Sequence, residues 1–279
     1  MNSFFEKIDF SLKRHPLLYF IRYILLSENR KDKNIDAIGC FNDHYSIEDA
    51  PNLYFTVNNQ IGINPSDDEF DRAIAIAKFL RNKISGGAGI GLSSEKTLEK
   101  MLANDVGVCS DFAQIFNIFC LINGIRVKEW GCVECFYNSK FGHSFNEIYS
   151  SKQQKWIAID IHKGIIFNDI KNNAHFSVVD LYRDLRKGGS LKITHYSDYT
   201  SPDLERIPLV YSSISIPFLI NNTQNSAVDY YYDKWQDTLP SVMINALLIL
   251  LRKNHTFIFV LDNYKLKLLP KSFQNLIAS

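Results

Sequence analysis

The chain of 279 residues has 46% hydrophobic residues and a formal net charge of +1. This composition is that of a globular protein with an ample core, and the balanced charge argues against binding to nucleic acid. The five cysteines are odd in number and irregularly spaced, which argues against a disulfide scaffold. We therefore expect a reducing compartment and a cytoplasmic protein.

The N-terminal residues 1–66 are expected to form an accessory region. A helix is predicted over residues 16–27, where Arg22 interrupts the apolar run and no cleavage site for a signal peptidase follows. The later apolar stretch 242–251 is too short to span a bilayer, so we expect no stable membrane insertion. Short strands are predicted at 53–57 and 60–63.

The next helix has a clear start signal, since Ser66-Asp67-Asp68-Glu69 has the pattern of a capping box. Apolar residues then recur at helical spacing: Phe70, Ile74, Ala77, Leu80 and Ile84. Gly86-Gly87 is expected to end this helix, and the glycine-rich stretch to Gly91 to be a flexible connector. A short helix that ends near Leu102 should follow, capped by Ser93 or Ser94.

Residues 109–123 are apolar almost all round, which predicts a helix buried at the centre of a domain, with Gly124 as its C-terminal cap. Strands are predicted at about 125–137, 143–149 and 156–162. A buried helix followed by antiparallel strands indicates an α+β fold, with a core over 67–170.

The remaining residues, 171–279, are expected to form an extension that packs on this core. Helices are predicted over 177–187 and 240–253, and a strand over 255–261. The aromatic tract Tyr230-Tyr231-Tyr232 with Trp235 is interpreted as core or cleft wall rather than a binding platform.

Three polar residues lie at the edges of the central elements. Cys109 opens the buried helix, where unpaired amide groups favour a thiolate and can bind an oxyanion. His143 opens the next strand, and Asp160 lies near the end of the strand after that. A thiol needs a base and the base needs an orienting group, so these three residues are candidates for a nucleophile, a base and an orienter.

Strand geometry tests whether His143 and Asp160 can meet. If Tyr149 and Trp156 pair across the turn, Phe145 faces Asp160, and His143 lies on the same face of the sheet. A slip by two residues would also bring His143 to Asp160, whereas a slip by one would separate them. His162 has the same parity as Asp160 and could also line the site.

Cys132 and Cys135 have the spacing of a zinc ligand pair, but a second pair is missing. Residues three apart on an extended strand point to opposite faces, and no strand–CxxC–helix context for a redox pair exists. We therefore expect one of these cysteines in the core and the other exposed. No metal and no cofactor are expected.

Three segments resemble the motifs of the transglutaminase-like superfamily: Gly107–Ala113 around Cys109, Gly142–Phe145 around His143, and Trp156–Asp160. The resemblance implies a papain-like core in a compact, bacterial-type protein, with Cys109 as nucleophile, His143 as general base and acid, and Asp160 as the orienting residue. Phe145 and Ile161-His162 depart from the residues that many relatives have there, which leaves substrate preference open.

The expected function is cysteine-dependent acyl transfer or hydrolysis at an amide, with a thioester on Cys109 that an amine or water resolves. The expected substrate is a peptide, an amide or an amine-bearing compound; the resemblance also includes proteins of polysaccharide pathways, which makes a polysaccharide precursor a further option. The alternative is a non-catalytic binding or scaffold protein that keeps the cleft. The sequence does not fix the oligomeric state.

Overall fold

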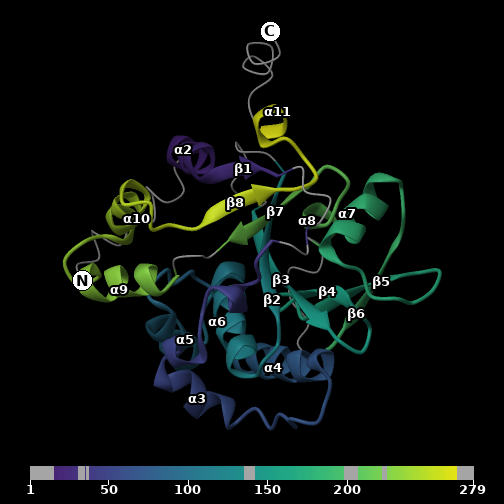
Figure 1. The fold of residues 1–279 in the computed structure, drawn as a ribbon, viewed down its shortest axis with the longest axis horizontal. Coiled ribbons are helices and arrows are strands. Elements are labelled where there is room, and N and C mark those ends of the chain that lie inside the picture. Colours follow the sequence, from purple (N-terminus) through teal and green to yellow (C-terminus); the bar gives the residue numbers. More distant parts are fainter. Residues whose placement is uncertain are drawn as a thin grey trace.

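An eight-stranded sheet in the order β1-β8-β7-β2-β3-β4-β5-β6 organises the computed structural model (Figure 1). The structure describes residues 16–30, 35, 38–134, 142–197, 207–221 and 225–268. The strands are β1 (Ser27–Asn29), β2 (Val127–Val133), β3 (His143–Ser150), β4 (Lys155–Asp160), β5 (Ile165–Asp169), β6 (Leu191–His195), β7 (Ile216–Asn221) and β8 (Thr256–Phe259). Within this sheet β1 and β8 are parallel, and the other neighbours are antiparallel.

Helices cover both faces of the sheet. They are α2 (Pro16–Leu26), α3 (Asn52–Asn58), α4 (Glu69–Lys83), α5 (Ser94–Asn104), α6 (Cys109–Ile122), α7 (Val178–Arg186), α8 (Ile207–Val210), α9 (Asn225–Trp235), α10 (Ser241–Leu250) and α11 (Tyr264–Leu268), with 3₁₀ turns η2 (Phe41–Asp43) and η3 (Ile47–Asp49). In the described part of the chain no single helix is long and apolar enough to cross a membrane; α5 and α6, bent by 114°, pass that test only as a pair, by length and composition. The eight-stranded sheet with helices on both faces confirms the predicted α+β class and the papain-like core that the resemblance implies.

Alternate strand residues feed two separate cores. On β4, Ile157 and Ile159 pack with α3, α4, α5 and α6, whereas Ala158 packs with α7 and α8 on the other face. Phe145 of β3 also belongs to the second core. Because side chains alternate along a strand, His143 and Asp160 lie on this same second face.

The helix α6 is the buried centre that the apolar sequence predicts. Its C-terminus is followed by Gly124 with φ +64°, the left-handed conformation expected of a glycine cap. A polar contact fixes the helix to the sheet: Asn146 Nδ2 donates to Asn117 Oδ1 at 2.8 Å and to the Ala113 carbonyl at 3.2 Å. This contact holds the middle of α6 in register with β3.

Several predicted boundaries are wrong. Residues 53–57 lie in the helix α3, because Tyr54 and Val57 share one helical face that packs on the core; residues 60–63 form no strand. The cap of α4 is Asp68, which accepts from the Asp71 amide at 2.9 Å, and the helix ends at Lys83 before the glycines. Residues 135–137 of the predicted strand lie outside the described residues.

The C-terminal predictions are confirmed within a few residues for α7, α10 and β8. Of the aromatic tract, Tyr232 is buried, and Tyr231 stacks on Trp235 with ring centroids 4.8 Å apart, while Tyr230 is exposed. The sequence did not indicate β5, β6 or β7. Of these, β7 extends the sheet beside β2, toward β8 and β1.

Candidate active site

His143 and Asp160 meet as the strand register predicts. Tyr149 pairs with Trp156, and the same register brings Asn146 opposite Ile159 without a slip. The His143 Nε2 atom lies 2.8 Å from Asp160 Oδ2, and both side chains are buried. The contact therefore follows from two strand ends and one tight turn.

Cys109 is the first residue of α6, and Asp111 organises the turn around it. Asp111 Oδ2 accepts from the amides of Val108 at 3.0 Å and Ile90 at 3.1 Å, so the loop at Ile90 and the residue before Cys109 are both tied to the helix start. The Cys109 side chain interacts with the His143 imidazole. Because Nε2 is bonded to Asp160, Nδ1 is the ring nitrogen left for the thiol.

The electrostatic interactions around His143 and Asp160 favour the ionised form of both residues. Burial alone would lower the pKa of His143, but the charge of Asp160, the Cys109 side chain and the hydrogen bonds to both raise that pKa to about 10. Burial would raise the pKa of Asp160, but the His143 charge and hydrogen bond outweigh it, and this pKa is lowered. At neutral pH the imidazole is therefore a cation held between a carboxylate and a thiol.

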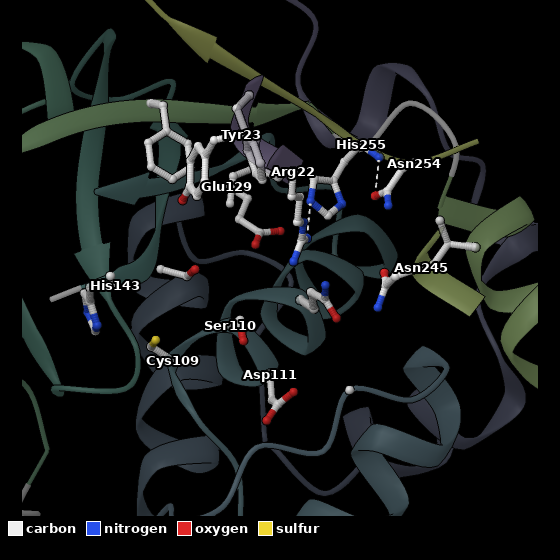
Figure 2. A pocket seen from close by; sticks show the side chains of 18 of the residues that line it. Arg22, Tyr23, Cys109, Ser110, Asp111, Glu129, His143, Asn245, Asn254 and His255 are labelled. Atoms are coloured by element: carbon white, nitrogen blue, oxygen red, sulfur yellow. Dashed lines mark hydrogen bonds between the residues drawn. The ribbon is translucent and has the colours of Figure 1, made fainter. Parts of the chain in front are cut away.

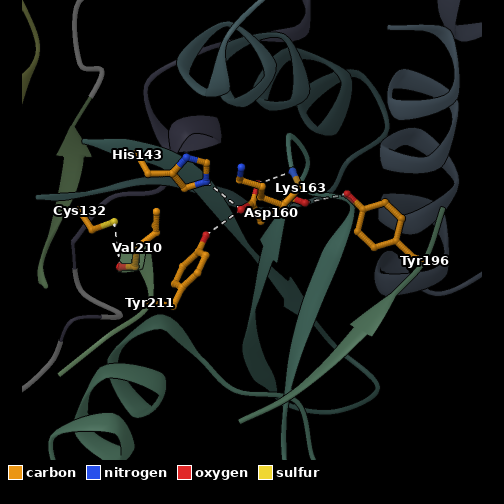
Figure 3. A network of polar contacts seen from close by, with 7 residues as sticks. All are labelled: Cys132, His143, Asp160, Lys163, Tyr196, Val210 and Tyr211. Atoms are coloured by element: carbon orange, nitrogen blue, oxygen red, sulfur yellow. Dashed lines mark hydrogen bonds and ion pairs between the residues drawn. The ribbon is translucent and has the colours of Figure 1, made fainter. Parts of the chain in front are cut away.

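Two tyrosines and a backbone amide complete the surroundings of Asp160 (Figure 3). The Tyr211 hydroxyl donates to Asp160 Oδ2 at 2.9 Å, the Lys163 amide donates to Oδ1 at 2.9 Å, and the Tyr196 hydroxyl donates to the Asp160 carbonyl at 3.0 Å. Tyr211 follows α8 and reaches the site from a distant part of the sequence. No sequence signal pointed to it, because its position depends on packing against Phe145 and Phe167.

We expect Tyr211→Phe to slow alkylation of Cys109 by about 5- to 10-fold, since it removes one hydrogen bond of about 1 kcal/mol from the orienting carboxylate. Tyr196→Phe is the matched control, because that hydroxyl reaches the Asp160 carbonyl rather than its carboxylate. Its rate should stay within about 2-fold of wild type. Equal rates for the two variants would show that Tyr211 does not act through the carboxylate.

His162 lies beside this group, with its ring centroid 6.0 Å from that of His143. Burial and then the positive charge of His143 lower the pKa of His162 to about 3. Its Nδ1 is buried without a hydrogen-bond partner among the described residues. His162 therefore lines the site, as its parity allows, in the neutral form.

Because this folded-state pKa lies below the unfolded value, His162 should destabilise the protein as the pH falls from 6.5 toward 3. The free energy of unfolding should fall by up to about 1.4 kcal/mol per pH unit through this residue. Urea unfolding would measure the free energy of unfolding of wild type and of His162→Gln across this pH range. As the pH falls, the free energy of unfolding of wild type should decrease relative to that of the variant. The exposed His195, replaced by glutamine, is the control; a constant difference between wild type and His162→Gln would contradict the expectation.

Cys132 pairs with His143 across β2 and β3, but its chemistry differs from that of Cys109. Burial raises the pKa of Cys132 to about 12, so this thiol stays neutral. It lies in the second core, as expected of one member of the pair, and Cys135 lies outside the described residues. Burial also raises the pKa of Cys40 and, further, that of Cys120, whereas Cys109 is only half-buried.

The glycine-rich stretch 86–91, expected to be a flexible connector, is an irregular and largely exposed loop that contacts the segment before Cys109. The Gly87 amide donates to the Gly107 carbonyl at 2.8 Å. Gly107 has φ +137°, and a Cβ atom there would lie 2.7 Å from Met101 Cε. The segment that leads into the thiol is therefore fixed by close contacts on both sides.

Cys109 and His143 line a cavity of about 350 Å³ (Figure 2). Its wall combines residues of α6 and β2 with residues from α2, α9, α10 and the segment before β8. Those from the distant parts include Arg22, Asp229, Tyr232, Asn245, Asn254 and His255. Cys109 and His143 therefore lie at one side of a pocket whose other walls include residues of α2, α9 and α10.

The architecture of the chain is a cysteine-based catalytic fold. The family model of the transglutaminase-like superfamily matches residues 56–161, so this part of the chain is a transglutaminase-like domain. A solved structure described as "a Putative Cysteine Protease from Cytophaga hutchinsonii" is similar at 19% identity and a TM-score of 0.33, over 47% of this chain and 43% of that one. That match spans less than half of either chain. No curated protein matches the sequence.

Proposed function

We propose that the protein is a cysteine-dependent acyltransferase or amidohydrolase, with Cys109 as nucleophile, His143 as general base and acid, and Asp160 as the orienting residue. The observation that carries this proposal is the 2.8 Å contact of His143 Nε2 with Asp160 Oδ2, because it leaves Nδ1 for the thiol at the start of α6. The core 67–170 then supplies the reacting groups, and the flanking regions 1–66 and 171–279 supply the far wall of the cavity.

The reaction proceeds by two substitutions at one carbonyl carbon. With the Cys109 proton on His143, Sγ attacks the amide carbon, and the negative charge on the oxygen is stabilised by amides of the first turn of α6. The C–N bond breaks, the leaving amine takes a proton from His143, and a thioester remains. Water or an amine then gives its proton to His143 and attacks the thioester, which yields an acid or a new amide and frees the thiol.

A free thiol is a requirement of this chemistry, and Cys40, Cys109, Cys120 and Cys132 are all unpaired. We therefore propose that the protein acts in a reducing compartment, the cytoplasm. Its substrate would be a peptide or another amide, including an amide or amine of a polysaccharide precursor. The cavity is partly open to solvent, so it can admit either water or an amine as the acceptor.

Trapping of the acyl-enzyme tests the proposal. The protein would be incubated with a library of peptide amides and activated esters, and intact-mass spectrometry would follow adducts on wild type and Cys109→Ala. We expect an acyl adduct that is mapped to Cys109, is absent from the variant and is released by hydroxylamine. The ratio of hydroxamate to acid with a competing amine distinguishes transfer from hydrolysis. If no adduct formed on Cys109 with any acyl donor, the non-catalytic binding alternative would replace this proposal.

A further inference from the structure

The far side of the cavity holds a positive charge without a counter-charge. Arg22 lies on α2 and points into the cavity (Figure 2). Its Nη2 donates to His255 Nε2 at 2.9 Å, and its guanidinium lies over the Phe257 ring at 5.7 Å. Its Nε is buried without a partner, and no carboxylate of the described residues lies within ion-pair distance of it.

His255 does not neutralise Arg22. Burial and the nearby Arg22 charge lower the pKa of His255 to about 3, so its ring is neutral and Nε2 accepts the hydrogen bond. The ring therefore orients the guanidinium without removing its charge. A partly buried cation in an apolar setting, beside Phe257, is costly unless an anion joins it.

Asn254 adds a second unused donor at the same corner. This residue is only 7% exposed and lines the cavity, and its Oδ1 accepts from the His255 amide at 2.8 Å. Its Nδ2 is buried without a hydrogen-bond partner among the described residues. The corner thus offers a guanidinium N–H and an amide N–H that nothing in the described protein accepts.

The carboxylates of the cavity are engaged elsewhere. Asp111 caps α6, Glu129 Oε2 accepts from Asn117 Nδ2 at 3.0 Å, and Asp229 accepts from the Ser94 amide and hydroxyl. Among the described lining residues these three carboxylates accompany two cations, Arg22 and His143. The cavity therefore has no excess of positive charge. A singly charged carboxylate fits this balance better than a doubly charged phosphate group.

We propose that Arg22 and Asn254 form a carboxylate-binding subsite, so that the substrate is an amide with a carboxylate at its far end. A guanidinium presents parallel N–H groups to both oxygens of a carboxylate, and the Asn254 amide adds a donor to one of them. The reacting carbonyl then lies at Cys109 while the carboxylate holds the other end. This inference rests on the proposed function, since it assigns Cys109 as the reacting end of the cavity.

A series of charged and neutral alkylating probes tests the subsite. N-iodoacetyl-glycine, N-iodoacetyl-β-alanine and N-iodoacetyl-6-aminohexanoic acid would be compared with their primary carboxamides, which differ only in charge. Mass spectrometry gives the second-order rate for Cys109. At one spacer length the acid should react at least about 10-fold faster than its carboxamide. Arg22→Gln should bring this ratio to within about 2-fold of unity, and Arg22→Lys to an intermediate value.

The ratio separates this inference from the proposed function. Selective labelling of Cys109 by the neutral carboxamides tests the nucleophile alone, whereas the acid-to-carboxamide ratio tests the subsite. Arg30→Gln is the matched control, because Arg30 is exposed and paired with Glu28 at 3.1 Å; its ratio should equal that of wild type. An acid-to-carboxamide rate ratio near unity at every spacer length would overturn the subsite. A high ratio that persisted in Arg22→Gln would also overturn it, because the attraction of the acid would then be due to His143.

Binding provides a second measurement that needs no reactive thiol. The N-acetyl counterparts of the same acids and carboxamides would be titrated into Cys109→Ala by calorimetry. The acid with the favoured spacer should bind at least about 10-fold more tightly than its carboxamide, and Arg22→Gln added to this variant should remove the difference. Equal affinities would refute the subsite whatever the reactivity of Cys109.

Discussion

Replacing His143 with alanine is expected to slow the alkylation of Cys109 by iodoacetamide at pH 7 by about 100-fold, because the variant lacks the imidazolium beside the sulfur. In the wild type the imidazole is a cation next to the thiol, because Asp160 and Cys109 raise its pKa to about 10 against the effect of burial. That charge lies beside the Cys109 side chain at the first turn of α6, the setting in which cysteines are reactive.

The measurement is the rate of alkylation against pH, mapped by mass spectrometry to each of the five cysteines. Cys40, Cys120 and Cys132 serve as internal references, since burial raises the pKa of each. The advantage of Cys109 should persist to about pH 9 and fade above pH 10, where His143 loses its proton. His195→Ala, at an exposed position on β6, is the control and should label like wild type. Labelling of Cys109 no faster than that of the references would remove the basis for catalysis.

Under the proposed function, Asp160→Asn is expected to lower the rate of acylation by about 10³- to 10⁴-fold while the fold is retained, because its carboxylate would set both the tautomer and the charge of the histidine. The carboxylate is fully buried, and the His143 charge that it supports has no other carboxylate in contact among the described residues. Without it, burial dominates, and the pKa of His143 should fall below 6.5.

An NMR titration of the His143 ring, run beside the acylation assay, measures both effects on the same protein. Asp169→Asn is the matched control, since Asp169 lies on the adjacent strand β5 and accepts from the Lys171 amide at 2.8 Å. It should leave the His143 titration unchanged. A His143 pKa that stayed near 10 in Asp160→Asn would show that another group holds the proton.

Local patterns predicted the centre of the site because they depend on nearby residues. The turn between Tyr149 and Trp156 sets the register, and the register alone places His143 beside Asp160. The apolar run of α6 likewise predicts a buried helix that starts at Cys109. These features involve few competing arrangements, so hydrophobic pattern and turn geometry are sufficient.

Long-range packing decided what the sequence did not reveal. Residues 53–57 have strand-forming side chains, yet Tyr54 turns toward Phe119 and donates to the Ser94 carbonyl at 2.9 Å, so tertiary contacts favour a helix. Tyr211 reaches Asp160 across 51 residues, and Arg22 reaches His255 across 233. No local pattern encodes such pairs, because each partner is an ordinary residue in its own segment.

The pairing of β1 with β8 has a consequence during synthesis on the ribosome. Residues 109–160 emerge before His255, which follows Asp160 by 95 positions (255 − 160), or by roughly 5–20 s at ordinary rates of elongation. The nascent chain thus contains Cys109, His143 and Asp160 before the opposite wall of their cavity exists. Under the proposed function, any selectivity that this wall provides would arise only once β8 has joined the sheet.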